Sequence, residues 1–155
     1  MISIIDCTPG NHKSVINMLK KIGVSNVYLT SDKDLLSQSK LIILPGVGNF
    51  ENVINILREN QLDLFLKKIF EEKKIFFLGI CAGMQILFEE SEESNESGLC
   101  IFKGELKKFL TIDKNNNLPI PQMGWNFIEK KKDSAFIRDL DLTSKFYFVH
   151  SYYVK

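Results

Sequence analysis

The chain has 155 residues, which is long enough for one domain of ordinary size with a hydrophobic core. Its composition, 45% hydrophobic and 25% charged, is typical of a globular protein rather than a disordered one. The formal net charge is +1, from 20 basic and 19 acidic residues, so charge gives no argument for binding nucleic acid or an anionic membrane.

The sequence also carries no targeting, membrane or metal-binding pattern. No apolar run approaches the ~20 residues that span a bilayer, and the N-terminus lacks the basic and long apolar segments of a signal peptide. Three widely spaced cysteines suggest neither a disulfide framework nor a zinc motif. We therefore expect a cytoplasmic protein without metal or cofactor, in which Cys7 and Cys100 are buried or inert thiols.

The first half of the chain alternates apolar strands with amphipathic helices. Four short apolar runs without polar alternation predict strands at residues 2–6, 26–30, 40–44 and 74–80. Apolar residues at helical spacing predict helices over 12–23, 53–57, 62–69 and 82–90. This order is typical of the α/β class, with a parallel sheet covered on both faces and sites at the carboxyl ends of its strands. Those ends are Asp6, residues 45–50 and Cys81.

The second half reads as strands and loops. Strands are predicted over residues 104–110 and 124–131, and an aromatic, β-branched strand over 145–154. The asparagines at 115–117 indicate a turn, and the acidic segment 90–98 reads as a solvated helix end and loop. Because the chain stops inside its last predicted strand, we expect one domain, residues 1–155, that is incomplete at its carboxyl end.

One cysteine lies at a glycine-flanked junction between a predicted strand and a predicted helix. The segment Gly79-Ile80-Cys81-Ala82-Gly83 matches the pattern of a nucleophile elbow, in which glycines remove side chains that would collide in a sharp turn. The start of the following helix favours the thiolate, and the Ala82 N–H can stabilise an oxyanion. A buried structural cysteine, with glycines serving only close packing, explains the same five residues equally well.

Four motifs carry a resemblance to a known family. The segments LPGVGNF, LGICAGMQILFEESEE, PQMGWN and YFVHSYY occur in the order and at the spacing of the triad-type class I glutamine amidotransferases. The chain resembles this family from Ile2 to Val154, and within it PGVGNF, PQMGWN and FVHSYY resemble the glutaminase subunits of imidazole glycerol phosphate synthases. The resemblance implies a flavodoxin-like three-layer α/β fold.

The resemblance also implies a reaction. Cys81 is expected to attack the side-chain amide of L-glutamine, forming a thioester and releasing ammonia, before water releases glutamate. The backbones of Val47 and Ala82 are the expected oxyanion donors, and the glycines beside Val47 allow a partner to reorient its peptide. The expected substrate-binding residues are Gly48, Gln85, Ser151 and Tyr152.

An ammonia-consuming partner follows from the same resemblance, since free ammonia would be protonated and lost in water. The implied partner is a (β/α)₈-barrel cyclase subunit of histidine biosynthesis, forming a heterodimer. The residues expected to face it are Asn11, Asn49 and Trp125. For Trp125, the only tryptophan, a place in the core is an equally good interpretation.

A cysteine amidohydrolase also needs a general base. The chain has only His12 and His150, and neither matches the family's catalytic histidine, which lies beyond HSYY in a motif like QFHPE. We interpret His150 as a packed strand residue and His12 as a helix-start or interface residue. The 155 residues alone are therefore expected to be inactive.

Two other functions remain open at the level of the sequence. The chain can be a non-catalytic docking subunit without the base, or a paralogous glutaminase that supplies another ammonia acceptor, such as an enzyme of surface-sugar amidation. Codons for His-x-Glu downstream of residue 155 would favour a catalytic glutaminase. A nucleotide-binding protein is disfavoured because the turns after the first strands lack a phosphate-binding glycine loop.

Overall fold

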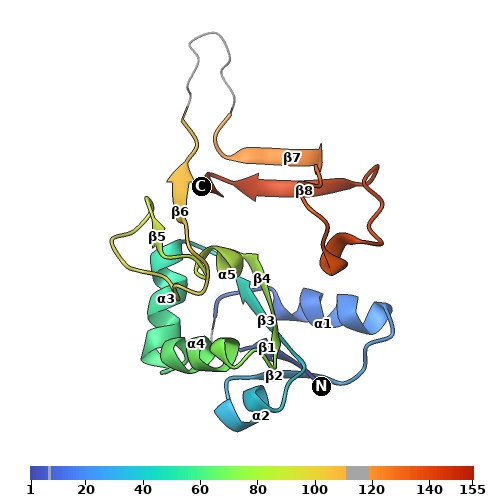
Figure 1. Ribbon diagram of the computed structural model, residues 1–155, viewed down its shortest axis with the longest axis vertical. Coiled ribbons are helices and arrows are strands. Elements are labelled where there is room, and N and C mark those ends of the chain that lie inside the picture. The colour runs from blue at the N-terminus through green and yellow to red at the C-terminus, as the bar shows by residue number, and fades with distance from the viewer. Residues whose placement is uncertain (7, 111–118) are drawn as a thin grey trace. The chain divides into compact units, whose positions relative to one another are not determined.

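The structure, a computed structural model, describes residues 1–6, 8–110 and 119–155 (Figure 1). The chain divides into two compact units, residues 1–107 with 154–155 and residues 108–153, each described by itself below. The single domain expected from the sequence stays a prediction. Cys7 and the predicted turn at 115–117 lie outside the described residues.

The first unit is built on a four-stranded parallel sheet in the order β2-β1-β3-β4. Its strands are β1 (Ile2–Ile5), β2 (Val27–Thr30), β3 (Leu41–Gly46) and β4 (Phe76–Cys81). All four were predicted, because each is a short β-branched or aromatic run with no polar alternation. The α/β class is thereby confirmed.

Helices cover both faces of this sheet. They are α1 (His12–Lys21), α2 (Lys33–Ser37), α3 (Phe50–Glu59), α4 (Asp63–Glu71) and α5 (Ala82–Gln85). Figure 1 shows α1 on the opposite side of the sheet from α3 and α4, as right-handed crossover connections require. The core lies between β1, β3 and the α3–α4 pair, where the fully buried side chains include Ile4, Ile43, Phe50, Leu57 and Leu66.

The predicted helices differ from the observed ones at three places. Helix α2, capped by Asp32, was not predicted because five residues are too few to show a periodicity. The helix expected over 12–23 ends at Lys21, because Gly23, with φ of 86°, turns the chain, and Ile22 is 67% exposed. The helix expected over 82–90 is a single turn that ends at Gln85.

That last helix is short because the chain after it pairs with a distant segment. The N–H groups of Leu99 and Ile101 donate to the carbonyls of Ile86 and Leu87, at 2.7 and 2.9 Å. The N–H of Gly98 likewise donates to Glu89 at 2.9 Å. Carbonyl groups of residues 86–89 therefore accept hydrogen bonds from the 98–101 segment instead of from a continuing helix. The helical spacing of apolar residues in the sequence gives no sign of this pairing.

The acidic segment 90–98 is not a free loop. It contains β5 (Glu90–Ser91), which pairs in parallel with β6 (Glu105–Lys108). Hydrogen bonds from Lys107 to Glu105, at 2.8 Å, and to Glu92, at 3.2 Å, raise the pKa of its ammonium group above the ordinary value. Arg58 of α3 pairs with Glu96 of the same segment. The predicted helix end is therefore wrong, whereas the predicted loop is confirmed over residues 92–98, which are turns and irregular chain.

The second unit contains an antiparallel hairpin of β7 (Gln122–Phe127) and β8 (Lys145–His150), with a short 3₁₀ helix, η1 (Ala135–Ile137), between them. The strand predicted over 145–154 is two strands, because the chain breaks at Ser151 before β9 (Tyr152–Val154). At the break, His150 Nδ1 donates to the Tyr152 carbonyl at 2.7 Å, and the Phe109 N–H donates to the Ser151 carbonyl at 2.9 Å.

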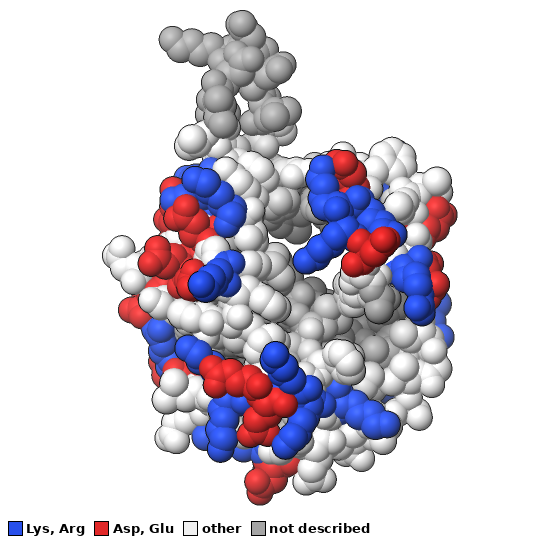
Figure 2. All heavy atoms as spheres, viewed as in Figure 1, with Lys and Arg blue, Asp and Glu red and all other residues white. Residues whose placement is uncertain are grey.

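The surface is mixed in charge. On the face shown in Figure 2, the Lys and Arg side chains lie interspersed with Asp and Glu. Within the described residues, no helix combines the length and apolar character that crossing a membrane requires. No cluster of three or more His, Cys, Asp or Glu side chains in this part of the chain is arranged to hold a metal ion.

Candidate active site

Cys81 occupies a strained turn at the end of β4. Its backbone has φ of 55° and ψ of −123°, a combination that side chains with a Cβ rarely adopt. The thiol is free and exposed, so the alternative of a buried structural cysteine is wrong. Cys81 is also in register with Gly46 at the end of β3, which brings the two strand ends together as the sequence predicted.

The glycines around Cys81 permit backbone contact between β3, β4 and α5. A Cβ on Gly83 would lie 2.0 Å from the Leu44 carbonyl oxygen, and one on Gly46 would lie 2.3 Å from the Gly83 nitrogen. A Cβ on Gly79 would lie 2.4 Å from the Met84 Cα. Close packing and the exposed cysteine are thus features of one turn, rather than alternatives.

The segment after β3, expected to supply an oxyanion donor, is bound to the turn at residues 8–10. The Val47 N–H donates to the Pro9 carbonyl at 2.9 Å, and the buried Thr8 hydroxyl donates to the Pro45 carbonyl at 2.8 Å. These two bonds run in opposite directions between the same pair of segments. In this arrangement the Val47 N–H is occupied by Pro9.

Gly48 gives this segment room to change. Its φ is 102°, and a Cβ placed on it would meet nothing nearer than the Asn52 side chain at 4.0 Å. Because glycine populates both signs of φ, Gly46 and Gly48 allow the peptides on either side of Val47, including the one that carries the Val47 N–H, to rotate. Val47 itself is 51% exposed, so its side chain does not hold the peptide in place.

Ala82 and Gln85 are the first and last residues of α5, which is a single helical turn. Ala82 is the first residue of the helix, where a backbone N–H has no acceptor within the helix. The helix has four residues. It therefore stabilises a negative charge on the Cys81 sulfur less than the nine-residue helix expected from the sequence would. Gln85 is half-buried one turn after Cys81.

The residues expected to face a partner have structural roles that the sequence analysis did not assign. Asn11 caps α1, its side chain accepting the Ser14 N–H at 3.2 Å, and Asn49 caps α3, accepting the Asn52 N–H at 2.8 Å. Asparagine directly before a helix is the signal that could have revealed both caps. Both residues are exposed, and their predicted contact with a partner stays a prediction.

Trp125, Ser151 and Tyr152 belong to the second unit. Trp125 is 65% exposed on β7 and stacks edge-on against Tyr147 of β8, so its placement in a core is wrong. The proposed substrate contacts of Ser151 and Tyr152 stay predictions.

The remaining residues singled out from sequence fall into ordinary positions. His12 opens α1 as expected, and His150 is a half-buried strand residue whose ring packs against Phe109 at 5.1 Å. Cys100 is exposed, with φ of 52°, rather than buried. Among the described residues, Thr8 and Glu93 contact the segment beside Cys81 and were not predicted, because both contacts join residues far apart in sequence.

Comparison with known proteins agrees with this geometry. The family model described as "Glutamine amidotransferase class-I" matches residues 3–155. A curated relative named "Imidazole glycerol phosphate synthase subunit HisH", from Leptospira interrogans, is 40% identical over 155 residues, covering 100% of this chain and 76% of the relative. A relative of the same name from Maridesulfovibrio salexigens is 42% identical over 156 residues, covering 99% of this chain and 73% of the relative.

A solved structure confirms the fold. The chain aligns with one described as "Crystal structure of glutamine amidotransferase" at a TM-score of 0.69, covering 97% of this chain and 70% of that one, with 18% sequence identity. The parallel sheet, the exposed cysteine at its carboxyl edge and the match over nearly every residue lead to one conclusion. This chain belongs to the class I glutamine amidotransferase family.

Proposed function

We propose that the protein is a glutaminase subunit that hydrolyses L-glutamine and passes ammonia to the cyclase subunit of an imidazole glycerol phosphate synthase in histidine biosynthesis. The observation that carries this proposal is Cys81, exposed at a strained strand–helix turn and in register with the glycine that begins the predicted oxyanion segment. The names of the curated relatives support the pathway.

The proposed chemistry follows from the turn. The Cys81 sulfur attacks the side-chain amide carbon of glutamine, and the carbonyl oxygen becomes an oxyanion that the N–H of Ala82 stabilises. Collapse of this intermediate breaks the C–N bond, releases ammonia and leaves a thioester. Water then breaks the thioester and gives glutamate. Each step needs proton transfers by a general base, for which the resemblance implies a histidine of a QFHPE-like motif.

A chloroketone analogue of glutamine tests the first step. The Cys81 thiolate first adds to its ketone carbonyl and forms an oxyanion; the sulfur then bonds to the chloromethyl carbon as the C–Cl bond breaks, chloride leaves and the carbonyl re-forms, so labelling needs no completed turnover. We expect labelling at Cys81 that glutamine suppresses, located by peptide mass mapping. Labelling that glutamine does not suppress, or that favours Cys100, would contradict the proposal and leave a docking subunit as the better reading.

We further propose that the partner is a (β/α)₈ barrel, that it forms a heterodimer with this chain in the cytoplasm, and that Asn11, Asn49 and Trp125 face it. Trp125, exposed on a hairpin whose neighbours Met123 and Phe127 are also exposed, supports such a surface. Co-purification of the two subunits tests the pairing, and Trp125→Ala is expected to weaken it at least about tenfold. An unchanged affinity would exclude Trp125 from the interface.

Substituting Thr8 with valine tests whether the turn at residues 8–10 restrains the oxyanion segment. The variant keeps the shape of the side chain but removes the hydrogen bond to Pro45, one of two that join the segments. We expect labelling by the chloroketone without a partner to rise severalfold, because the Val47 N–H is then held less firmly on Pro9.

Ser39→Ala is the matched control for Thr8→Val. The Ser39 hydroxyl makes a buried hydrogen bond of similar length, 2.7 Å, to Ser3 at the opposite end of the sheet. Thr8→Val removes one buried hydroxyl hydrogen bond, and Ser39→Ala removes the bond to Ser3 together with a longer one to the Leu35 carbonyl at 3.2 Å; each is expected to lower the free energy of unfolding by about 1 kcal/mol. Equal labelling rates for the two variants would show that the turn does not restrain the segment.

A further inference from the structure

Glu93 reaches from the acidic segment to the start of α3. Its carboxylate oxygen Oε2 accepts the backbone N–H of Phe50 at 2.8 Å, across 43 residues of sequence. Phe50 is the first residue of α3, and its own side chain is fully buried. A negative charge accepting a first-turn N–H benefits from both the hydrogen bond and the positive end of a ten-residue helix.

The start of α3 is therefore fixed by three groups. Asn49 caps the helix through the Asn52 N–H, Glu93 accepts the Phe50 N–H, and the Phe50 ring lies in the core. First-turn N–H groups have no acceptor within their own helix, so the two side-chain acceptors fill a need that the helix cannot meet. The residue immediately before Asn49 is Gly48.

The other end of the same segment is fixed as well. Gly46 packs so closely on the backbone of α5 that a Cβ there would lie 2.3 Å from the Gly83 nitrogen, and Pro45 accepts the Thr8 hydroxyl. Between Gly46 and Asn49 lie only Val47 and Gly48. Rotation of the Gly46–Val47 peptide, which carries the Val47 N–H, therefore takes place between two fixed ends.

We propose that Glu93 is a positioning residue of the glutaminase site, holding the downstream end of the oxyanion segment so that the Gly46–Val47 peptide, which carries the Val47 N–H, turns from Pro9 toward Cys81 without moving α3. This inference rests on the proposed function. Glu93 acts through Phe50 and Asn49 and does not itself contact the reacting atoms. The acidic run thus has a specific role at the site, besides attaching a loop.

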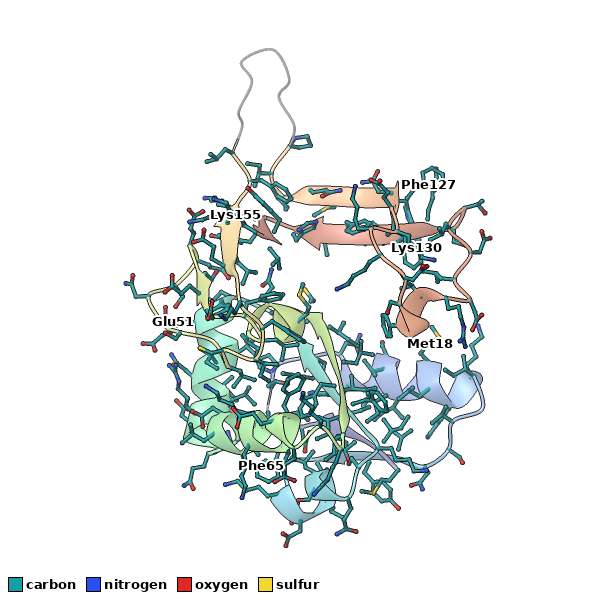
Figure 3. The ribbon with its side chains drawn as sticks, viewed as in Figure 1. Met18, Glu51, Phe65, Phe127, Lys130 and Lys155 are labelled. Atoms are coloured by element: carbon teal, nitrogen blue, oxygen red, sulfur yellow. The ribbon has the colours of Figure 1, made fainter. Side chains whose placement is uncertain are left out.

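The other contacts of the segment are separable from this one. The Ser94 hydroxyl donates to the Glu51 carboxylate at 3.1 Å, and Arg58 pairs with Glu96 and donates to the Ser97 carbonyl at 2.7 Å. Glu51, labelled in Figure 3, shows where the segment lies against α3. Ser94→Ala and Glu96→Ala therefore loosen the same segment from the same helix without touching the Phe50 N–H.

The test compares Glu93→Ala and Glu93→Gln with those two controls in the full chain. Labelling by the glutamine chloroketone is expected to slow about tenfold in Glu93→Ala. This loss is smaller than the roughly 10²–10³-fold loss expected when an oxyanion donor is removed, because the donor is still present but less well positioned. Glu93→Gln keeps an acceptor without charge and should slow about threefold. Labelling by iodoacetamide, which forms no oxyanion, should stay within about twofold in all variants, as should chloroketone labelling of the controls.

Amide hydrogen exchange, followed by NMR, provides a readout that does not depend on the reaction. Exchange at Phe50, Val47 and Gly48 is expected to quicken in Glu93→Ala and to remain as in the unmodified chain in Glu96→Ala. Equal chloroketone rates in Glu93→Ala and Glu96→Ala, or equal exchange at Gly48, would overturn the role of Glu93. If the unmodified chain shows no glutamine-protected labelling, the proposed function fails, and the exchange rates alone decide whether Glu93 positions the segment.

Discussion

Replacing Cys81 with alanine or glycine is expected to abolish labelling by the glutamine chloroketone, and the glycine variant is expected to be the more stable of the two. Neither variant retains a nucleophile, so labelling at this position should be lost completely, whereas the unmodified chain is labelled without a completed turnover. The difference in stability has a separate cause. Cys81 has φ of 55°, and alanine keeps the Cβ that makes this conformation costly.

Glycine adopts the same backbone conformation without that steric cost. Because the thiol is exposed, little packing is lost by its removal, and Cys81→Gly should unfold about 1 kcal/mol less easily than Cys81→Ala. Urea denaturation of the two variants measures this difference directly. Equal midpoints would mean that the turn stores no strain, whereas glutamine-protected labelling that persists in either variant would exclude Cys81 as the nucleophile.

The four strands of the parallel sheet and the position of Cys81 follow from local sequence. Four apolar runs, each ended by glycine, proline or a polar residue, are sufficient to place β1, β2, β3 and β4 in a parallel sheet. The carboxyl ends of such strands meet at one edge, which is why Cys81 and Gly46 are neighbours in the structure. Glycine spacing alone predicts the sharp turn that follows.

The errors occur where distant segments override local preference. Residues 86–89 have the spacing of a helix, yet their carbonyls accept N–H groups from residues 98–101. The apolar run 145–154 has the composition of one strand, yet it breaks at Ser151, whose carbonyl accepts the N–H of the distant Phe109. In both cases the deciding hydrogen bonds depend on tertiary context, for which a pattern of hydrophobicity contains no signal.

The contacts around the oxyanion segment were missed for the same reason. Thr8 lies 37 residues from Pro45 and Glu93 lies 43 residues from Phe50, so no local rule connects them. From sequence alone, an acidic run such as residues 90–98 is most simply interpreted as exposed to solvent. That interpretation changes only once the structure places Glu93 beside the first residue of α3, whose N–H it accepts. The reactive residue is therefore visible in the sequence, whereas the groups that hold its surroundings are not.

Gly83→Ala is expected to be the most destabilising of the substitutions considered, although it adds a single methyl group. The new Cβ would lie 2.0 Å from the Leu44 carbonyl oxygen and 2.8 Å from the Leu44 carbonyl carbon, both backbone atoms of β3 that have no rotamer to change. Relief requires α5 to move away from the sheet, which breaks the close packing of Gly46 on Gly83. We expect a loss of about 3 kcal/mol or more in the free energy of unfolding.

Gly23→Ala is the control that separates contact from backbone conformation. Gly23 has φ of 86° and open space around it, so its substitution costs only the strain of a positive φ, about 1 kcal/mol. Gly83, in a helix, carries no such strain, and its larger cost would come from contact alone. If urea denaturation gave Gly83→Ala no greater loss than Gly23→Ala, the backbone of β3 would not confine α5. The position of Cys81 would then depend on its own strained turn rather than on the packing behind it.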